Sequence, residues 1–166
     1  MTRLMRRLCW DMPGPGVGWW RSVGPEGLSG ARGVFDVDIS SVTMGEPDLD
    51  AYLMGAGMLE RDAHPRSRFT LKRLVPTDPG ATLAPATIVP VALHGTFEMK
   101  GKAIDLVVAA QLEVVAWDDG RPRLLLDGSW QIDVLEPFGM YGPDGGPPGT
   151  GRTLLYTCSV VLEPGA

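Results

Sequence analysis

A long stretch of alternating side chains is the feature that most constrains the fold of this chain. Apolar residues alternate with polar ones over residues 87–99 and again over 103–117, on both sides of a Lys100–Gly101 break. Such alternation on two segments joined by a short break is typical of a long antiparallel hairpin with one apolar face. That face must be buried. In a chain with few helical signals, a curled sheet or barrel buries it most directly.

Further alternating segments extend this hairpin into a larger sheet. They lie at residues 33–40, 66–75, 124–135 and 152–163. Between the first two of these segments, residues 45–62 place apolar side chains at helical spacing, which indicates a short helix or an ordered loop. Strands in this order, with one short helical connection and then successive hairpins, predict an all-β fold. We expect an antiparallel lipocalin-like β-barrel with meander connections.

The chain divides into an irregular leader and one domain. Residues 1–32 are rich in Arg, Gly, Pro and Trp and show neither helical nor strand periodicity, whereas residues 33–166 carry all of the alternating segments. With 166 residues in total, the chain is long enough for a single domain with a substantial core. The leader is either disordered, or it covers a sheet edge or a barrel mouth with Trp19 and Trp20.

The charge distribution bears on partners and location. The chain carries 15 basic and 20 acidic side chains, a net charge of −5; the leader, with five Arg against Asp11 and Glu26, carries +3 and the remainder −8. An acidic body does not attract a phosphate backbone, so we expect no nucleic-acid partner. We also expect no membrane span. Because Asp11 and Pro13 interrupt the basic start before an export signal forms, we expect a cytoplasmic protein, or a periplasmic or secreted one if the true N-terminus differs.

The alternation also predicts which side chains face the inside of the barrel. This inward set comprises Phe35, Val37, Ile39, Phe69, Leu71, Val91, Leu93, Phe97, Ile104, Leu106, Val108, Leu112, Trp130, Ile132, Tyr156 and Val160. Such side chains either fill the interior or line one ligand-sized cavity. The residues alone favour a filled interior, whereas the resemblance described below favours a cavity.

Side chains that carry out chemistry are few and stand in unfavourable places. His64 lies beside a proline in a turn and His94 on the polar face of a strand, so we interpret both as surface residues. Asp36 and Asp38 share a polar strand face, where they offer oxygen ligands to a hard cation but are more simply solvated. The sequence contains no nucleophile elbow, phosphate loop or Cys/His metal spacing. We therefore predict no enzyme activity, no catalytic or metal-binding residues, and no cofactor; the resemblance described below adds a bound lipid.

Four local features, in this order along the chain, resemble the YceI-like lipid-binding family. They are the strand end and turn Asp38–Gly45, the connection Asp48–Glu60, the strand start Ala63–Phe69 with its His-Pro pair, and the glycine-flanked hairpin Gly95–Ile104. The similarity covers roughly residues 33–136 and, more weakly, the final strand. No single feature is specific, and their order along the chain makes the resemblance.

The resemblance implies a lipocalin-like barrel with a long apolar cavity that binds isoprenoid or fatty-acyl lipids. On that basis we predict a noncatalytic binding or carrier protein whose cavity is lined by the inward set. The alternative is a protein-interaction module with a solid core, which uses an open sheet edge and the Trp19–Trp20 leader. The family's first strands are expected before residue 33. If they are missing, the leader or a second subunit covers the open edge, so a homodimer is one of the outcomes.

Overall fold

The computed structural model of the chain describes residues 9–10, 28, 31–43, 45–116, 122–141 and 153–164. The strands form one seven-stranded sheet in the order β1-β7-β6-β5-β4-β3-β2. The long strands are β2 (Gly33–Asp38), β3 (Arg66–Pro76), β4 (Ile88–Met99), β5 (Lys102–Ala116), β6 (Pro122–Asp133) and β7 (Thr153–Pro164). Each runs antiparallel to the next in the chain, which confirms the predicted meander.

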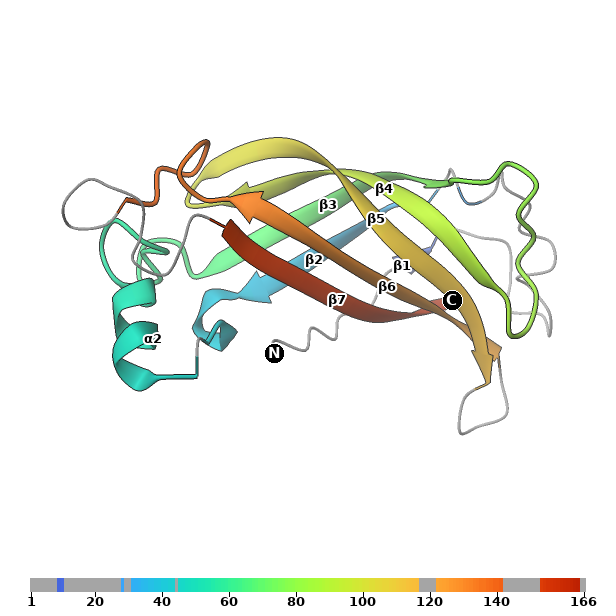
Figure 1. Cartoon of the computed structure of the whole chain (residues 1–166), viewed down its shortest axis with the longest axis horizontal. Helices are drawn as coiled ribbons and strands as arrows, with labels where there is room; N and C mark the ends of the chain where they lie inside the picture. The colour runs from blue at the N-terminus through green and yellow to red at the C-terminus, as the bar shows by residue number, and fades with distance from the viewer. Residues whose placement is uncertain are drawn as a thin grey trace.

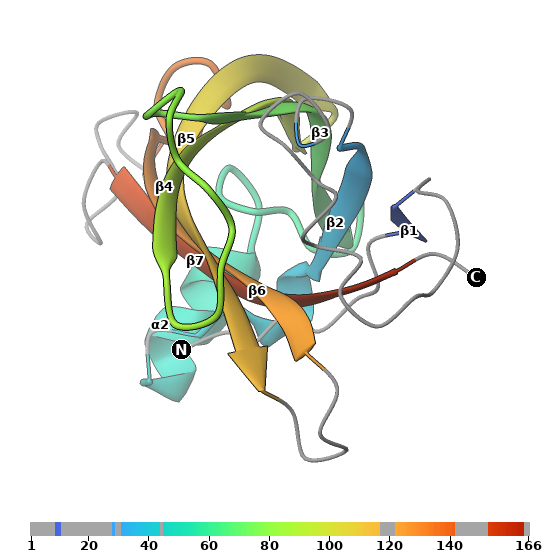
Figure 2. The ribbon, with the colours of Figure 1, turned by 90° about the vertical axis from the view of Figure 1, so that its right-hand side faces the viewer.

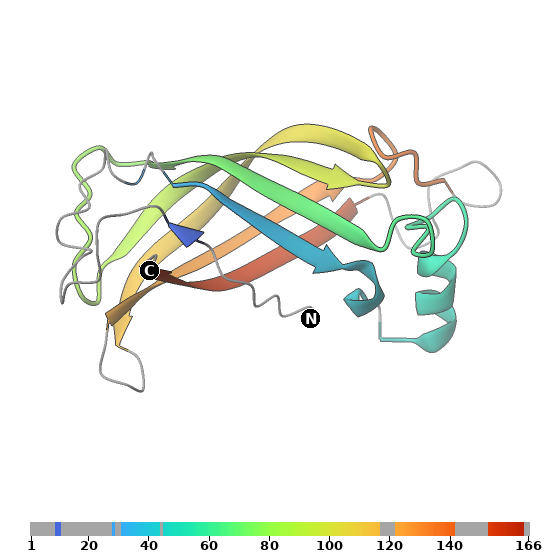
Figure 3. The ribbon, with the colours of Figure 1, turned by 180° about the vertical axis from the view of Figure 1, so that it is seen from behind.

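The sheet curls around its apolar face into a half-barrel (Figures 1 and 2). Strands β2 and β7 border the open side, which faces the viewer in Figure 3. In the part of the chain that the structure describes, no ladder joins these two strands. The short strand β1 (Cys9–Trp10) pairs in parallel with the last residues of β7. Leu28 and Ala31, which also belong to the predicted leader, are buried in the core.

The central hairpin forms as the alternation predicts. Strands β4 and β5 pair without interruption from Ile88↔Glu113 to Met99↔Lys102. Lys100 and Gly101 connect them, with φ values of 52° and 68°. Two consecutive left-handed residues form the type I′ turn, whose twist matches that of the flanking strands. The register of the longest ladder in the molecule is therefore fixed by its turn.

Strand β3 contains an irregularity that changes which side chains face inward. The pairing with β4 shifts between Leu71 and Arg73, so that Lys72 and Arg73 are both exposed and Leu74 is fully buried. An extra residue in one strand of an antiparallel pair bends that strand and shifts the alternation beyond it. Leu74 therefore joins the core, although alternation counted from Phe69 places it outside.

One end of the half-barrel, called here the α2 end, is covered by helix α2 (Pro47–Met54) and two loops (Figure 1). Pro47 starts the helix, where its missing N–H costs no hydrogen bond. The helix and loops place an apolar layer against this end, formed by the buried side chains of Leu53, Met58, Leu59, Phe138 and Met140. The predicted helical connection is therefore present, and it closes one end of the interior.

Ile39 differs from the expectation in one respect. The alternation places it in a strand, but β2 ends at Asp38 and Ile39–Ser41 form a 3-10 turn. The Asp38 carboxylate accepts a hydrogen bond from the Ser40 backbone N–H at 2.9 Å, and this local bond competes with the strand ladder. The Ile39 side chain is nevertheless buried. Trp19 and Trp20 lie outside the described residues.

Candidate ligand-binding interior

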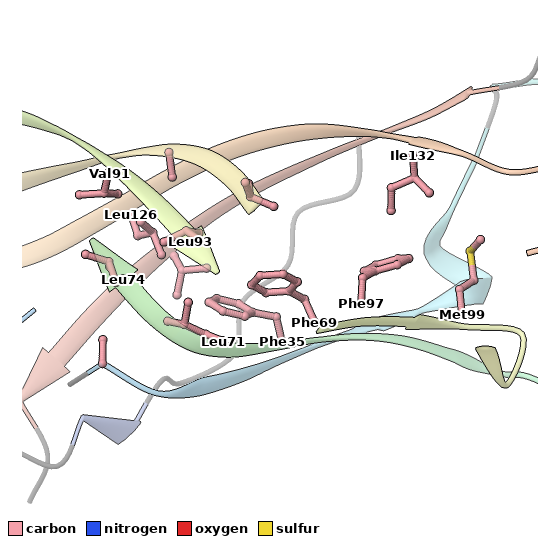
Figure 4. Close-up of a cluster of buried hydrophobic side chains, with 14 of the residues drawn as sticks. Phe35, Phe69, Leu71, Leu74, Val91, Leu93, Phe97, Met99, Leu126 and Ile132 are labelled. Carbon is pink, nitrogen blue, oxygen red and sulfur yellow. The ribbon is translucent and has the colours of Figure 1, made fainter. Parts of the chain in front are cut away.

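The structure places the inward set on the concave face of the sheet. Its buried members are Phe35, Ile39, Phe69, Leu71, Val91, Leu93, Phe97, Val108, Leu112, Ile132 and Val160. Its half-buried members that pack against this core are Ile104, Leu106, Trp130 and Tyr156. Val37, on the edge strand β2, is half-buried and does not join the core cluster. Figure 4 shows Phe69 and Phe97 pointing into the interior from β3 and β4.

The opposite face of the sheet carries the polar side chains. Glu98, Asp105 and Gln131 are exposed. Lys72 binds Asp105 at 2.8 Å, and Thr96 donates a hydrogen bond to the same carboxylate at 2.7 Å. These bonds hold the pKa of Asp105 below its usual value. The wettable side chains of the hairpin therefore point away from the interior.

The remaining polar candidates also have local partners. Asp36 accepts hydrogen bonds from Arg68 at 2.7 and 3.2 Å, a paired contact that raises the pKa of the guanidinium. His94 lies 3.5 Å from an Arg73 nitrogen on the outer face. In the described part of the chain, no group of three or more His, Cys, Asp or Glu side chains gathers into a site for a metal ion.

The half of the interior away from α2 is aliphatic and closed. Leu74, Leu112, Leu124 and Leu126 are fully buried there. Strands β5 and β6 pair continuously along this half, from Ala116↔Pro122 to Ala110↔Gly128. A continuous ladder and fully buried side chains leave no route between the strands. We call this part the closed half.

Toward the α2 end, strands β5 and β6 separate. Their ladder stops at Ala110↔Gly128, although β5 remains paired with β4 as far as Lys102, and β6 with β7 as far as Asp133. We call this separation the fork and the part of the interior beside it the split half (Figure 1). Gly128 stands at the last pair, where a Cβ would lie 3.2 Å from the Ala110 Cβ. Glycine inside a strand marks such close approaches and bends.

Aromatic side chains fill much of the split half. Trp130 stacks on Tyr156 with ring centroids 5.4 Å apart and lies 6.0 Å from the ring of Phe69. Phe97 contacts Tyr156 edge to face at 5.1 Å, and Phe138 at 5.8 Å. Separations of this size are favourable for offset and edge-to-face ring pairs. The two halves of one interior therefore differ in chemistry: one is aliphatic and the other aromatic.

The inward-facing side chains beside the fork are the ones that stay partly accessible. Ile104 and Leu106 on β5 and Trp130 on β6 are half-buried, whereas Val108 and Leu112, further along β5, are buried. On β7, Leu154, Tyr156 and Cys158 are also half-buried. Apolar side chains that face an interior and yet remain accessible are typical of a ligand site. The split half is therefore the candidate site.

The core cluster holds polar atoms but no charged residue, and the buried Lys100 side chain at the α2 end is paired with Glu60. Ser67 is the one buried polar residue among those described, and neither its Oγ nor the Trp130 Nε1 has a hydrogen-bond partner. Burial raises the pKa of Tyr156 to about 12; the nearby Ser67 hydroxyl opposes this rise. Burial likewise raises the pKa of Cys158 to about 11. Both groups are therefore neutral at ordinary pH, and the lining is uncharged.

A second hollow lies on the outside of the sheet. This outer groove has a volume of about 970 Å³, and most of its lining side chains are exposed. Pro90, Gln111, Asp127 and Ser159 follow one another across four strands in register and form its floor. These side chains belong to the outward face, but Val91, Ala110 and Cys158 also line the groove, so it reaches the sheet at the last β5–β6 pair.

Several core residues are missing from the prediction. Leu124 and Leu126 are absent from the inward set, although they lie on the same side of β6 as Ile132 and the alternation of this strand accounts for them. Phe138 and Met140 lie in a loop, where no periodicity identifies a buried face. The fork has one sequence signal, the isolated Gly128 within the alternation of β6, since a lone glycine in a strand indicates a bulge or a close approach.

Comparison with known proteins agrees with this architecture. A family profile described as the YceI-like domain matches residues 20–147. The crystal structure of the Campylobacter jejuni YceI protein superposes with a TM-score of 0.61 at 16% identity, covering 78% of this chain and 70% of that one. Burkholderia cenocepacia BcnA gives 0.53 at 16% identity, covering 78% and 72%. These structures are similar to this chain in fold.

No curated protein sequence matches the chain significantly. Among the described residues, none of the helices has the length and apolar character that crossing a bilayer requires. The profile match covers most of the chain and includes residues 20–32, ahead of the segment in which the sequence features are found. The chain belongs to the YceI-like domain family, a family of β-barrel binding proteins.

Proposed function

We propose that this protein is a noncatalytic binding or carrier protein that holds a long apolar ligand, an isoprenoid or fatty-acyl lipid, inside the half-barrel. The observation that carries the proposal is the partly accessible apolar lining beside the fork. Ile104, Leu106 and Trp130 face the interior without being fully buried. A ligand lying against them removes apolar surface from water on both sides, which is the main driving force for such binding.

The lining supplies enough free energy without any polar motif. Burying a lipid chain contributes about 0.8 kcal/mol per CH₂, so ten methylenes give roughly 8 kcal/mol before the cost of association. Among the described residues, the core cluster contains no charged member, which favours a ligand whose buried part is neutral. Affinity of this kind requires the chain length and shape of the ligand to match the interior, and it needs no cofactor or metal.

A protein-interaction module is the second candidate. The outer groove favours it, because a hollow of about 970 Å³ that crosses several strands offers a surface for another molecule. A partner docked there leaves the interior unused. The two functions therefore predict different consequences for substitutions on the two faces of the same strand.

The experiment compares neighbouring residues of β5. Leu106 faces the interior, and Val107, 65% exposed, faces outward. We expect the purified protein to release a lipid into an organic extract, detected by mass spectrometry, and to bind fluorescent fatty-acyl or isoprenoid probes. Leu106→Glu places a charge in the apolar lining and should abolish probe binding, whereas Val107→Glu should leave it unchanged.

The carrier proposal fails if extracts of the wild-type protein contain no lipid and neither probe binds. It also fails if both glutamate variants bind the probes as the wild type does. Circular dichroism of each variant confirms that the sheet is retained, so that lost binding is separated from lost folding.

A further inference from the structure

Two buried polar atoms in the split half have no partner. The hydroxyl of Ser67 and the indole N–H of Trp130 are enclosed by the protein, and no described residue completes a hydrogen bond to either, although the Tyr156 hydroxyl lies close enough to Ser67 for the two hydroxyls to interact. Buried polar groups in folded proteins are nearly always hydrogen-bonded, because an unpaired one loses its bonds to water without replacement. Two such atoms in one small interior point to a partner from outside the chain.

The surrounding packing brings both residues to the same region. Ser67 lies on β3 two residues before Phe69, on the same face, and Trp130 packs 6.0 Å from the Phe69 ring. Trp130 also stacks on Tyr156, whose hydroxyl contacts the Met99 sulfur at 3.4 Å. The neighbouring pair Arg68↔Glu98 places Ser67 next to Met99 across the β3–β4 ladder. The two unpaired groups thus lie in one aromatic cluster near the α2 end.

The types of group restrict what they can bind. An indole N–H only donates, and a serine hydroxyl both donates and accepts, so the atom that satisfies both is a hydrogen-bond acceptor. No charged residue belongs to the described core cluster, and the buried Lys100 side chain at its α2 end, 7% exposed, is already paired with Glu60. A carboxylate or phosphate in this cluster would lose its hydration without gaining a counter-charge. The complementary atom is therefore an uncharged oxygen.

We propose that Ser67 and Trp130 are specificity-determining residues that donate hydrogen bonds to an uncharged carbonyl or hydroxyl oxygen of the lipid bound in the split half. This inference rests on the proposed function and adds the chemistry by which one lipid is preferred over another. The apolar lining binds the chain of the ligand, and the two donors select a ligand with a neutral oxygen at the matching position. An internal water satisfies the same atoms, and the experiment must exclude it.

The test uses three probes of matched chain length: heptadecanone, heptadecane and heptadecanoate. Trp130→Phe removes the N–H and retains an aromatic ring against Tyr156, and Ser67→Ala removes only the hydroxyl. We expect each substitution to weaken ketone binding roughly three- to tenfold, as for the loss of one net hydrogen bond. Heptadecane affinity should be unchanged by both. In wild-type protein labelled with ¹⁵N, the Trp130 indole signal should shift with ketone and stay in place with heptadecane.

Four results would overturn the inference. The first is an ordered water only: the Trp130 signal does not respond to ketone, and ketone and alkane bind alike. The second is an equal loss of ketone and alkane binding in the variants, which assigns both residues to packing. The third is ketone binding that neither substitution weakens. The fourth is carboxylate binding as tight as ketone binding, with the same dependence on Ser67 and Trp130. If alkane and ketone bind and only the discrimination fails, the proposed function stands; if no probe binds, both fail.

Discussion

The closed half and the split half are built from the same strands and yet differ in almost every respect. In the closed half, β5 and β6 pair continuously and enclose leucine side chains that are fully buried. In the split half the same two strands separate, and the lining is aromatic, partly accessible and contains unpaired polar atoms. The change occurs at a row of small side chains, Ala110, Gly128 and Cys158, that lie next to one another across three strands.

The difference shows how one sheet serves two purposes. Fully packed aliphatic side chains give the greatest stability, because each removes its whole apolar surface from water. A binding site needs the opposite, since surface that the protein has already buried contributes nothing when a ligand arrives. Separating two strands beyond a small-residue row keeps part of the lining accessible while the other half holds the fold together.

The largest expected effect is a difference in the free energy of unfolding between alanine substitutions of two leucines on β5. Leu112, in the closed half, is 0% exposed, and Leu106, beside the fork, is half-buried. Leu112→Ala should lower the free energy of unfolding by about 2–5 kcal/mol, because it removes buried methyl groups and leaves a cavity. Leu106→Ala should cost roughly 1 kcal/mol, because its side chain is already partly solvated. Urea unfolding measures both values, and equal losses would contradict the division into two halves.

Substitution of Gly95 by alanine should have the next largest effect on the free energy of unfolding. It lies on β4 under the ring of Phe69, and a Cβ built there would stand 2.5 Å from both the Phe69 Cζ and the Thr70 carbonyl oxygen. The Phe69 ring can move away from the new methyl group, but the Thr70 backbone oxygen cannot rotate away. Gly95→Ala should therefore displace the ring, strain the β3–β4 pairing and lower the free energy of unfolding by about 1–3 kcal/mol. Because Phe69 contacts Trp130, the same variant should also change the tryptophan fluorescence.

Gly80 provides the matched control for this substitution. It lies in an exposed loop, where a Cβ would be 3.4 Å from a flexible Asp78 side chain. Gly80→Ala should therefore change the free energy of unfolding by less than about 0.5 kcal/mol. If Gly95→Ala were as mild as the control, the close contact between Phe69 and β4 would be wrong.

The sequence predicts the sheet better than it predicts the site. Alternation in β4 and β5 is unbroken, and their turn has a residue pair suited to a tight hairpin, so both strands and their register are recoverable. Alternation fails at the β3 irregularity, where Leu74 changes sides, because an inserted residue leaves no mark in composition. It also fails in loops, where Phe138 is buried by tertiary contacts alone.

The fork shows the same limit more strongly. Whether two strands remain paired depends on the packing of both, and Gly128 is only a hint of where they separate. Unpaired polar atoms are harder still to foresee. Alternation predicts that Trp130 faces inward, but whether its indole N–H has a hydrogen-bond partner depends on the packing of all its neighbours. Sequence patterns identify the lining, and only the assembled interior shows which lining atoms lack a partner.

The smallest expected effect on stability concerns the contacts that hold the β4–β5 hairpin in place in the split half, where no β5–β6 ladder does so. Lys100, in the β4–β5 turn, binds Glu60 at 2.9 Å and donates to the Gly57 carbonyl oxygen at 3.3 Å. These contacts attach the hairpin to the loop that follows α2. The hydrogen bond and the charge of Lys100 hold the pKa of Glu60 below its ordinary value of 4.5. A carboxyl group with a depressed pKa stabilises the folded protein at pH values above its ordinary pKa. This stabilisation is lost as the pH falls through the pKa of the folded state.

Glu60→Gln should therefore lower the free energy of unfolding by about 1 kcal/mol at neutral pH, and the difference from the wild type should shrink as the pH falls below about 4.5. Asp62→Asn is the control, because that carboxylate is 92% exposed and its ion pair is with the neighbouring Arg61. Urea unfolding at a series of pH values measures both variants. A Glu60→Gln deficit that persists unchanged in acid would show that Lys100 holds the hairpin through packing, and that charge has no part in keeping the split half in place.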